Sequence, residues 1–178
     1  MTITLRAATA ADGPALQDVE LRAGAQFRDV GMADIADHDP SSLDELASYA
    51  DAGRSWVAID ETGHTDTGQV VGYVIVDVVD GCAHVEQVSV VPVAQGRGVG
   101  RALLDRVRTW AVESGCPALT LTTFTDVAWN RPLYEHLGFR VLAEPEIGPE
   151  LRAVRAIETA HGLDPASRVC MRLDLDPV

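Results

Sequence analysis

One short stretch of the chain, residues 93–104 (VAQGRGVGRALL), alternates glycine with larger residues just before a helical pattern. At the start of a helix the first backbone N–H groups have no helical partner, and the helix dipole adds partial positive charge. Glycine has no Cβ, so an anion can approach these N–H groups closely. Arg97 and Arg101 add full positive charge beside them. The stretch therefore predicts an anion site, and a diphosphate is its natural occupant.

Two common phosphate-binding motifs do not match this stretch. The dinucleotide fingerprint is G-x-G-x-x-G after the first strand of a βαβ unit, whereas Gly96, Gly98 and Gly100 alternate late in the chain. The phosphate loop of nucleoside triphosphatases ends in Gly-Lys-Ser or Gly-Lys-Thr, and this chain contains no lysine. Taken alone, the glycines also fit a plain tight turn.

The elements around the glycines form a regular order. Period-two and β-branched runs predict strands over residues 2–6, 55–60, 69–80 with a bulge at Gly72, 83–91, 118–124, 140–142 and 168–175. Period-3.6 runs predict helices over residues 9–23, 41–53, 102–113, 129–139 and 148–163, with Ser42 as the cap of 41–53 and a break at Gly138 in 129–139. A weak helical stripe covers 27–40, and 61–68 is a polar turn. This order predicts one mixed α+β domain over residues 1–178.

Composition excludes several classes of protein. A hydrophobic content of 47% and a charged content of 23% are typical of a folded domain. No apolar run reaches the roughly 18 residues of a membrane span, and the N-terminus lacks a signal-peptide pattern. Cys82, Cys116 and Cys170 have neither a disulfide nor a metal-site spacing. We expect a cytoplasmic protein with reduced thiols, no metal and no membrane contact.

The chain is strongly acidic. Its net charge is −13, and all 14 basic residues are arginine. Such a charge repels nucleic acid and anionic lipid and favours cationic small molecules, although it also simply confers solubility. No basic stripe with interleaved aromatic residues is present, so no nucleic-acid partner is expected.

The stretch from Gln95 to Gly100 resembles the Q/R-x-x-G-x-G/A motif of the GNAT superfamily of N-acetyltransferases. It has the family's position too, after a strand (VEQVSVVP) and before a helix. Further along, WNRPLYEHLGF (129–139) is similar to the family's second signature. The resemblance covers roughly residues 3–142. It implies an α+β GNAT fold, with a mixed, mostly antiparallel sheet of about seven strands splayed at strands 4 and 5 and flanked by helices.

The resemblance implies acetyl-CoA as the acetyl donor. The donor-binding residues that it implies are Val88, Ser89, Val90, Gln95, Gly96, Arg97, Gly98, Val99, Gly100, Arg101 and Asn130. Backbone N–H groups of residues 96–101 would hold the pyrophosphate, supported by Gln95 and Arg97. The strand at Val90 would pair with the pantetheine arm, and an N–H near Val90 would stabilise the tetrahedral oxyanion.

Three further side chains are candidates for proton transfer. Tyr134 matches the family's tyrosine acid, which protonates the departing thiolate, and its structural alternative is a packing role. The amine arrives as ammonium and must lose a proton, for which Glu86 is the candidate base. His84 lies on the same strand face, because alternate residues share a face. A solvated carboxylate and a plain surface or core histidine are the structural alternatives for these two residues.

Asn130 departs from the family pattern. Many members place the asparagine seven residues before the tyrosine, where this chain has Val127, whereas Asn130 lies four before it. Asn130 therefore either reaches the pantetheine amides from a shifted position or caps the short helix that Pro132 begins.

The expected function is transfer of an acetyl group from acetyl-CoA to a primary amine, by direct attack through a tetrahedral intermediate. The acceptor is expected to be a small molecule or peptide that contacts residues 21–51, an acidic region compatible with a cationic amine or with a solvated surface. The alternatives are a non-catalytic acetyl-CoA-binding domain and a transferase that uses another acyl-CoA. The sequence leaves homodimer formation open.

Overall fold

The computed structural model describes residues 2–62 and 68–175, so the middle of the predicted turn 61–68 lies outside the described residues. The strands are β1 (Ile3–Ala7), β2 (Ser55–Asp60), β3 (Gln69–Val79), β4 (Cys82–Val90), β5 (Ala118–Phe124), β6 (Arg140–Val141) and β7 (Arg168–Asp174). The α-helices are α1 (Gly13–Gly24), α2 (Ala33–Ala36), α3 (Leu43–Asp51), α4 (Val99–Glu113), α5 (Arg131–His136) and α6 (Pro149–Ala160). Short 3-10 helices are η1 (Ala10–Asp12), η2 (Ala25–Val30), η3 (Pro92–Ala94), η4 (Glu144–Glu146) and η5 (Pro165–Ser167).

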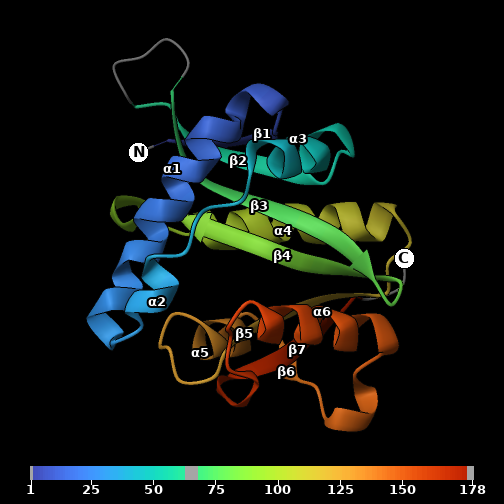
Figure 1. Cartoon of the computed structure of the whole chain (residues 1–178). Helices are drawn as coiled ribbons and strands as arrows, with labels where there is room; N and C mark the ends of the chain where they lie inside the picture. Colours follow the sequence, from blue (N-terminus) through green and yellow to red (C-terminus); the bar gives the residue numbers. More distant parts are fainter. Residues whose placement is uncertain (1, 63–67, 176–178) are drawn as a thin grey trace. The chain divides into compact units, whose positions relative to one another are not determined.

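The strands form one mixed sheet in the order β1-β2-β3-β4-β5-β7-β6 (Figure 1). β1 and β2, β2 and β3, β5 and β7, and β6 and β7 pair antiparallel, whereas β4 and β5 pair parallel. The parallel register between β4 and β5 covers three described residue pairs, from Ala83↔Leu119 to Val85↔Leu121, although β5 continues to Phe124. The α+β class and the seven-stranded, mostly antiparallel sheet flanked by helices are confirmed.

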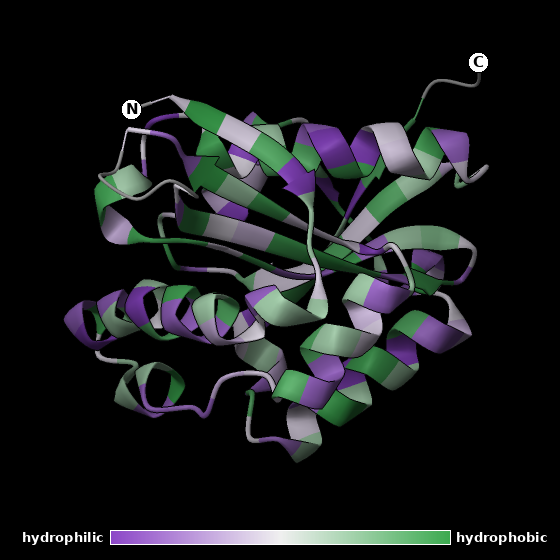
Figure 2. Ribbon diagram, turned by 90° about the horizontal axis from the view of Figure 1, so that it is seen from above, coloured by the Kyte–Doolittle hydropathy of each residue, from purple (hydrophilic) through white to green (hydrophobic). Residues whose placement is uncertain are grey.

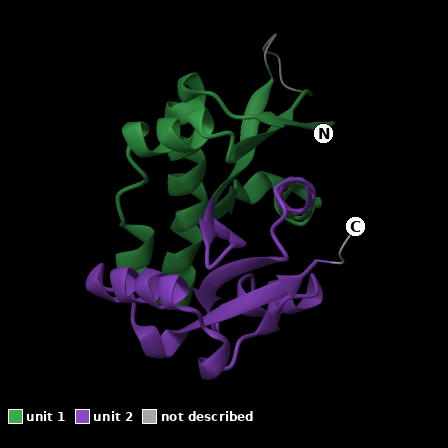
Figure 3. Cartoon of the chain, turned by 90° about the vertical axis from the view of Figure 1, so that its right-hand side faces the viewer, with its two compact units in different colours: residues 1–76, 87–106 green, residues 77–86, 107–178 purple. Residues whose placement is uncertain are grey.

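The chain divides into two compact units, coloured separately in Figure 3. Unit 1 contains residues 1–76 and 87–106, and unit 2 contains residues 77–86 and 107–178. β3 and β4 each contribute residues to both units. The assignment of all 178 residues to one domain stays a prediction.

The start of unit 1 is held by caps and one ion pair. Asp12 accepts hydrogen bonds from the Thr9 backbone N–H and hydroxyl at 2.8 and 2.9 Å, and its carboxylate pairs with Arg6 at 2.7 Å. The Arg6 hydrogen bond lowers the pKa of Asp12 to about 2. Ser42 accepts the Glu45 backbone N–H at 3.2 Å, which is the cap predicted for α3.

Apolar strand faces and helix stripes build the core of each unit. Figure 2 shows strands that are mainly hydrophobic and helices that carry both hydrophobic and hydrophilic residues. Fully buried core residues of unit 1 are Leu16, Val19, Leu46, Val57, Val74 and Leu103. Those of unit 2 are Val107, Ala111, Ala118, Leu119 and Met171. Burying a valine, leucine or methionine side chain stabilises a fold by about 1.5–3 kcal/mol.

The register of β2 and β3 shifts between the pairs Ala58↔Gly72 and Ile59↔Val70, so the irregularity lies next to the bulge predicted at Gly72. A Cβ on Gly72 would lie 3.0 Å from the Ser89 carbonyl oxygen, so this strand position needs glycine because of close backbone approach.

Several predicted helix boundaries were wrong. α4 begins at Val99 rather than at residue 102, because the Gly98 carbonyl accepts the Ala102 N–H at 2.9 Å and starts the helical ladder. The break predicted at Gly138 is present (φ 95°), and α5 covers Arg131–His136. The helix predicted over 148–163 is shorter, because it ends at Ala160 before a turn at Gly162 (φ 88°). The weak stripe over 27–40 forms only η2 and α2.

Candidate functional site

The glycine stretch lies in unit 1 between η3 and α4. Gly96 has φ 70° and Gly98 has φ 81°, a left-handed conformation that favours glycine. A Cβ built on either residue meets no described atom within 4 Å, so the backbone here faces open space. Gly100 differs, because it lies in the first turn of α4 and its Cβ would be 3.8 Å from a Val90 methyl.

The first turn of α4 presents N–H groups that have no partner one turn earlier in the helix. They belong to Val99, Gly100 and Arg101, and α4 is 15 residues long. Arg97 and Arg101 are exposed, and Arg101 Nε lies 3.8 Å from an Asp105 carboxylate oxygen, a weak surface pair. The loop therefore combines backbone donors, positive charge and room for an anion.

The end of β4 supplies a second set of backbone donors. Val91 N–H donates to the Val71 carbonyl on β3 at 2.9 Å. Because backbone groups alternate along a strand, the N–H and C=O of Val90 point away from β3. The Gln95 side chain donates to the Val90 carbonyl at 3.0 Å, so Gln95 ties the loop to the end of this strand. Val88 and Val90 are half-buried, and Ser89 is buried.

Tyr134 lies on α5, in unit 2. Its ring makes an edge-on contact with Phe139, with centroids 5.7 Å apart and an interplanar angle of 69°. The ring is half-buried by its accessible surface, and burial raises the pKa of the Tyr134 hydroxyl to about 12. Tyr134 therefore keeps its proton at neutral pH, as an acid must.

Asn130 precedes α5, and its carbonyl accepts the Tyr134 N–H at 3.1 Å. In the described part of the chain its side chain makes no capping hydrogen bond to this helix. The backbone of Asn130 thus begins the helix, whereas the side-chain cap considered from sequence is not formed.

His84 and Glu86, the two candidate bases, lie on β4 in unit 2. His84 is 1% exposed, and its Nδ1 lies 2.9 Å from the Thr120 hydroxyl. Burial lowers the pKa of His84 to about 4, so the imidazole is neutral at pH 7. The exposed Glu86 carboxylate lies 3.8 Å from His84 Nε2. The two candidate bases thus lie side by side, with the Glu86 carboxylate exposed to solvent and the His84 imidazole buried.

Thr120 was missed by sequence reasoning. It is 3% exposed, and the parallel register places it opposite His84. Only knowledge of which strands are neighbours could have found this pair, because the two residues are 36 positions apart. Glu20 and Tyr73 of unit 1 were missed for the same reason. Tyr73 OH donates to Glu20 at 2.7 Å, across 53 positions of sequence.

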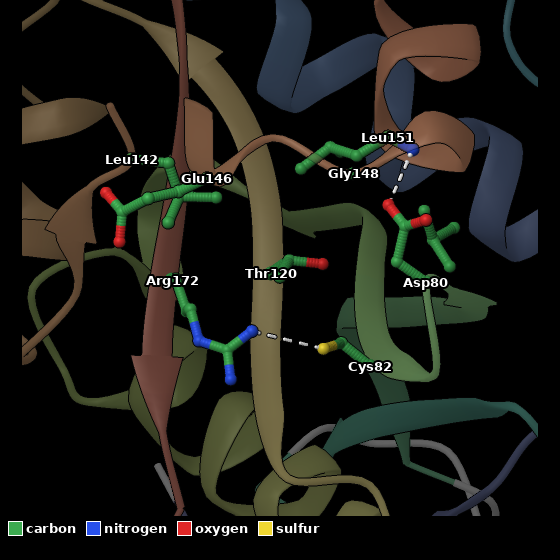
Figure 4. Close-up of a pocket in the computed structure, with 9 residues that line it drawn as sticks. Asp80, Cys82, Thr120, Leu142, Glu146, Gly148, Leu151 and Arg172 are labelled. Carbon is green, nitrogen blue, oxygen red and sulfur yellow. Dashed lines mark hydrogen bonds between the residues drawn. The ribbon is translucent and has the colours of Figure 1, made fainter. Parts of the chain in front are cut away.

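Unit 2 also contains a small cavity of about 80 Å³ (Figure 4). It is lined by Val79, Asp80, Cys82, Thr120, Leu142, Glu146, Gly148, Leu151 and Arg172. Figure 4 shows two hydrogen bonds at this cavity. The Leu151 N–H donates to the Asp80 carboxylate at 3.0 Å, and the Arg172 guanidinium donates to the Cys82 sulfur at 3.3 Å. The space suits a few water molecules, and its charged groups already have protein partners.

The described residues offer neither a metal site nor a membrane anchor. No group of three or more His, Cys, Asp or Glu side chains among them is arranged to hold a metal ion. Within residues 2–62 and 68–175, every helix is too short or too polar to cross a bilayer.

Solved structures with the same fold cover nearly the whole chain. A PaiA N-acetyltransferase from Thermoplasma acidophilum, in complex with coenzyme A, has a TM-score of 0.72 and 14% identity, covering 98% of this chain and 100% of its own. A Mycobacterium tuberculosis protein with coenzyme A has a TM-score of 0.70 and 22% identity, covering 97% and 99%. The Escherichia coli ribosomal-protein-S18-alanine N-acetyltransferase has a TM-score of 0.66 and 20% identity, covering 99% and 96%.

Residues 24–139 match the family model of the acetyltransferase (GNAT) family. The match spans more than half of the chain and contains both the glycine stretch and the segment around Tyr134. The chain therefore belongs to the GNAT acetyltransferase family, and it is an acyltransferase.

Proposed function

We propose that this protein transfers an acetyl group from acetyl-CoA to a primary amine by direct attack through a tetrahedral intermediate. The observation that carries the proposal is the open glycine backbone at Gly96 and Gly98, placed at the start of α4 and next to the end of β4. Family membership and the coenzyme A present in two structural relatives support it.

Donor binding is assigned to unit 1. N–H groups at the start of α4 hold the pyrophosphate, and Arg97 and Arg101 add charge without specific geometry. The pantetheine arm lies along Val88, Ser89 and Val90 as an added strand. The Val90 N–H, which points away from β3, donates to the thioester oxygen and stabilises the oxyanion as it forms.

Proton removal from the amine is assigned to Glu86, directly or through water. An alkyl ammonium has a pKa of about 10, so only a small fraction of the amine is neutral at pH 7. Glu86 is the exposed member of the pair, whereas His84 is enclosed and has a pKa of about 4. His84 is therefore a weak base, and we assign proton removal to the Glu86 carboxylate that lies 3.8 Å from its Nε2.

Proton delivery to the leaving thiolate is assigned to Tyr134. The Tyr134 hydroxyl has a pKa of about 12, whereas a thiol has a pKa of about 8.5. Complete transfer is therefore uphill by about 3 to 4 pKa units. Tyr134 contributes mainly a hydrogen bond to sulfur as negative charge develops, and its proton is replaced from solvent after transfer.

The experiment that tests this function measures coenzyme A release from acetyl-CoA with and without a panel of primary amines. Amine-dependent release supports the proposal. Acetyl-CoA binding without release for any amine would instead indicate a non-catalytic binding domain. A higher rate with a longer acyl-CoA would reassign the donor. A protein that binds none of these thioesters contradicts the proposal.

A further inference from the structure

Glu20, on α1, is a half-buried carboxylate held from the protein side by two donors. Its Oε2 atom accepts the Tyr73 hydroxyl at 2.7 Å and the Ser41 backbone N–H at 3.3 Å. Tyr73 is completely buried in the middle of β3. Burial is the main cause that raises the pKa of Tyr73, so the hydroxyl stays a donor at any working pH. The carboxylate is thus fixed in one orientation.

This carboxylate is connected to the strand assigned to the donor. The Ser89 side chain on β4 is 5% exposed, and its polar group near Tyr73 lowers the pKa of the Tyr73 hydroxyl against the larger effect of burial. Gln87 donates to the Ser89 hydroxyl at 2.8 Å. Glu20, Tyr73 and Ser89 all belong to unit 1, together with Val90 and the glycine stretch.

Within the described residues, no cation is paired with Glu20. The two arginines nearest in sequence are engaged elsewhere, because Arg22 pairs with Asp18 at 3.2 Å and Arg28 pairs with Asp37. Glu45 adds negative charge near Tyr73 rather than compensating it. Removing a carboxylate from water without a counter-charge is unfavourable, and a cationic ligand would reverse that penalty.

We propose that Glu20 binds the ammonium group of the acceptor, so that the acceptor is a cationic primary amine without a carboxylate close to its nitrogen. The inference rests on the proposed function, because it takes β4 as the strand that carries the thioester. The ammonium donates one N–H to Glu20, chiefly to Oε1, while Tyr73 and Ser41 hold Oε2. After deprotonation the neutral amine still has an N–H for Glu20, and its lone pair is free to attack.

The first test compares Glu20→Gln with the wild type, using n-butylamine, 1,4-diaminobutane and 4-aminobutanoate. The substitution keeps an oxygen for Tyr73 and removes the negative charge. We expect the KM for n-butylamine to rise about 10- to 100-fold, the usual effect of losing a hydrogen bond to a charged group. The kcat and the Kd for acetyl-CoA should be nearly unchanged. The wild type should prefer the diamine to 4-aminobutanoate.

Asp18→Asn is the matched control, because it removes one carboxylate from the same helix at an exposed position. It should leave the KM within about twofold of the wild-type value, as expected for a surface charge. Tyr73→Phe frees the carboxylate without removing its charge, and it should raise the KM less than Glu20→Gln does. An equal rise in KM for Asp18→Asn would show a general charge effect and overturn the assignment of Glu20.

A binding measurement keeps the inference testable apart from turnover. Calorimetric titration of 1,4-diaminobutane, with and without coenzyme A, should show binding to the wild type that weakens in Glu20→Gln. No binding to the wild type, or equal binding to both proteins, overturns the inference even if acetyl-CoA binds normally. Failure of acetyl-CoA to bind instead contradicts the proposed function, while the diamine titration without coenzyme A still reports on Glu20.

Discussion

The glycine stretch of unit 1 and the side chains around His84 in unit 2 represent two ways of building a functional region. At the glycine stretch the proposed contacts are backbone N–H groups, and the residue types matter because they leave the backbone open. Around His84 and Tyr134 the proposed contacts are titratable side chains whose pKa values depend on burial. The first kind of region can be recognised in a sequence, whereas the second needs the three-dimensional neighbours of each residue.

The largest effect is expected from breaking the backbone region with Gly98→Asp. An aspartate would place a Cβ and a negative charge where the pyrophosphate is expected, so the Kd for acetyl-CoA should rise on the order of 100-fold or more. Gly53→Asp is the matched control, because Gly53 has φ 69° and open space but lies after α3. Equal affinities of Gly98→Asp and the wild type by calorimetry would remove the glycine stretch from the site.

The second-largest effect is expected from Tyr134, in the side-chain region of unit 2. Tyr134→Phe should lower kcat by about 10²- to 10⁴-fold and leave the Kd for acetyl-CoA nearly unchanged. Phe139→Leu removes the ring contact but keeps the Tyr134 hydroxyl. It should lower the melting temperature and reduce kcat much less than Tyr134→Phe does. Because the pKa of Tyr134 is about 12, wild-type activity should show no alkaline fall from this group below about pH 11. A fully active Tyr134→Phe variant would make the tyrosine a packing residue.

Substitutions at Glu86 and His84 test which of these two residues removes the proton from the amine. Glu86→Gln should flatten the acidic limb of the pH–rate profile, with the largest loss near pH 7 and a smaller one as the pH approaches the pKa of the amine, about 10. His84→Gln should keep the limb. A limb that survives in Glu86→Gln and vanishes in His84→Gln would make His84 the base. Unchanged profiles for both variants would leave Tyr134 as the sole side chain assigned to proton transfer.

His84 should also affect stability in a pH-dependent way. Its pKa is about 4 in the folded protein and about 6.5 in an unfolded chain, so the unfolded state binds more protons between these values. The stability that His84 contributes is therefore complete above pH 6.5 and is lost as the pH falls toward 4, by about 3 kcal/mol in total. Urea unfolding of the wild type and His84→Gln at pH 7.5 and 4.5 measures this difference. Parallel pH dependence in both proteins would contradict a buried neutral imidazole.

The smallest effect is expected for Asn130→Ala. As far as the structure describes the chain, the Asn130 side chain makes no capping hydrogen bond to α5. The free energy of unfolding should therefore fall by less than about 1 kcal/mol, the usual contribution of a helix cap. A measurable rise in the Kd for acetyl-CoA would support the pantetheine contact, whereas a stability loss of 1 kcal/mol or more would restore the capping role.

Sequence reasoning succeeded where local chemistry determines local structure. The order of strands and helices, the Ser42 cap and the bulge near Gly72 follow from hydrophobic period, cap residues and a glycine inside a β-branched run. The start of α4 was placed three residues late, because a run of glycines lowers helix propensity although Gly100 is helical in this context.

The candidate site was predictable only in part. The glycine motif indicated the donor-binding region, because glycines can be read in the sequence and they are what leaves the backbone N–H groups open. The sequence could not show that His84 is enclosed with Thr120, or that Glu20 on α1 bonds Tyr73 on β3. Both contacts join residues far apart in sequence, and their pKa consequences depend on how much water each group loses.

Amide NMR during an acetyl-CoA titration measures directly whether backbone N–H groups of the glycine stretch bind the acetyl donor. We expect saturating shifts for the amides of Gly96, Gly98, Val99, Gly100 and Arg101, and for the Val90 amide on β4. We expect little change at Asp80, Cys82 and Arg172 around the cavity of unit 2. Saturating shifts confined to that cavity, or no shift at the glycine stretch while acetyl-CoA binds, would show that the donor does not bind these N–H groups.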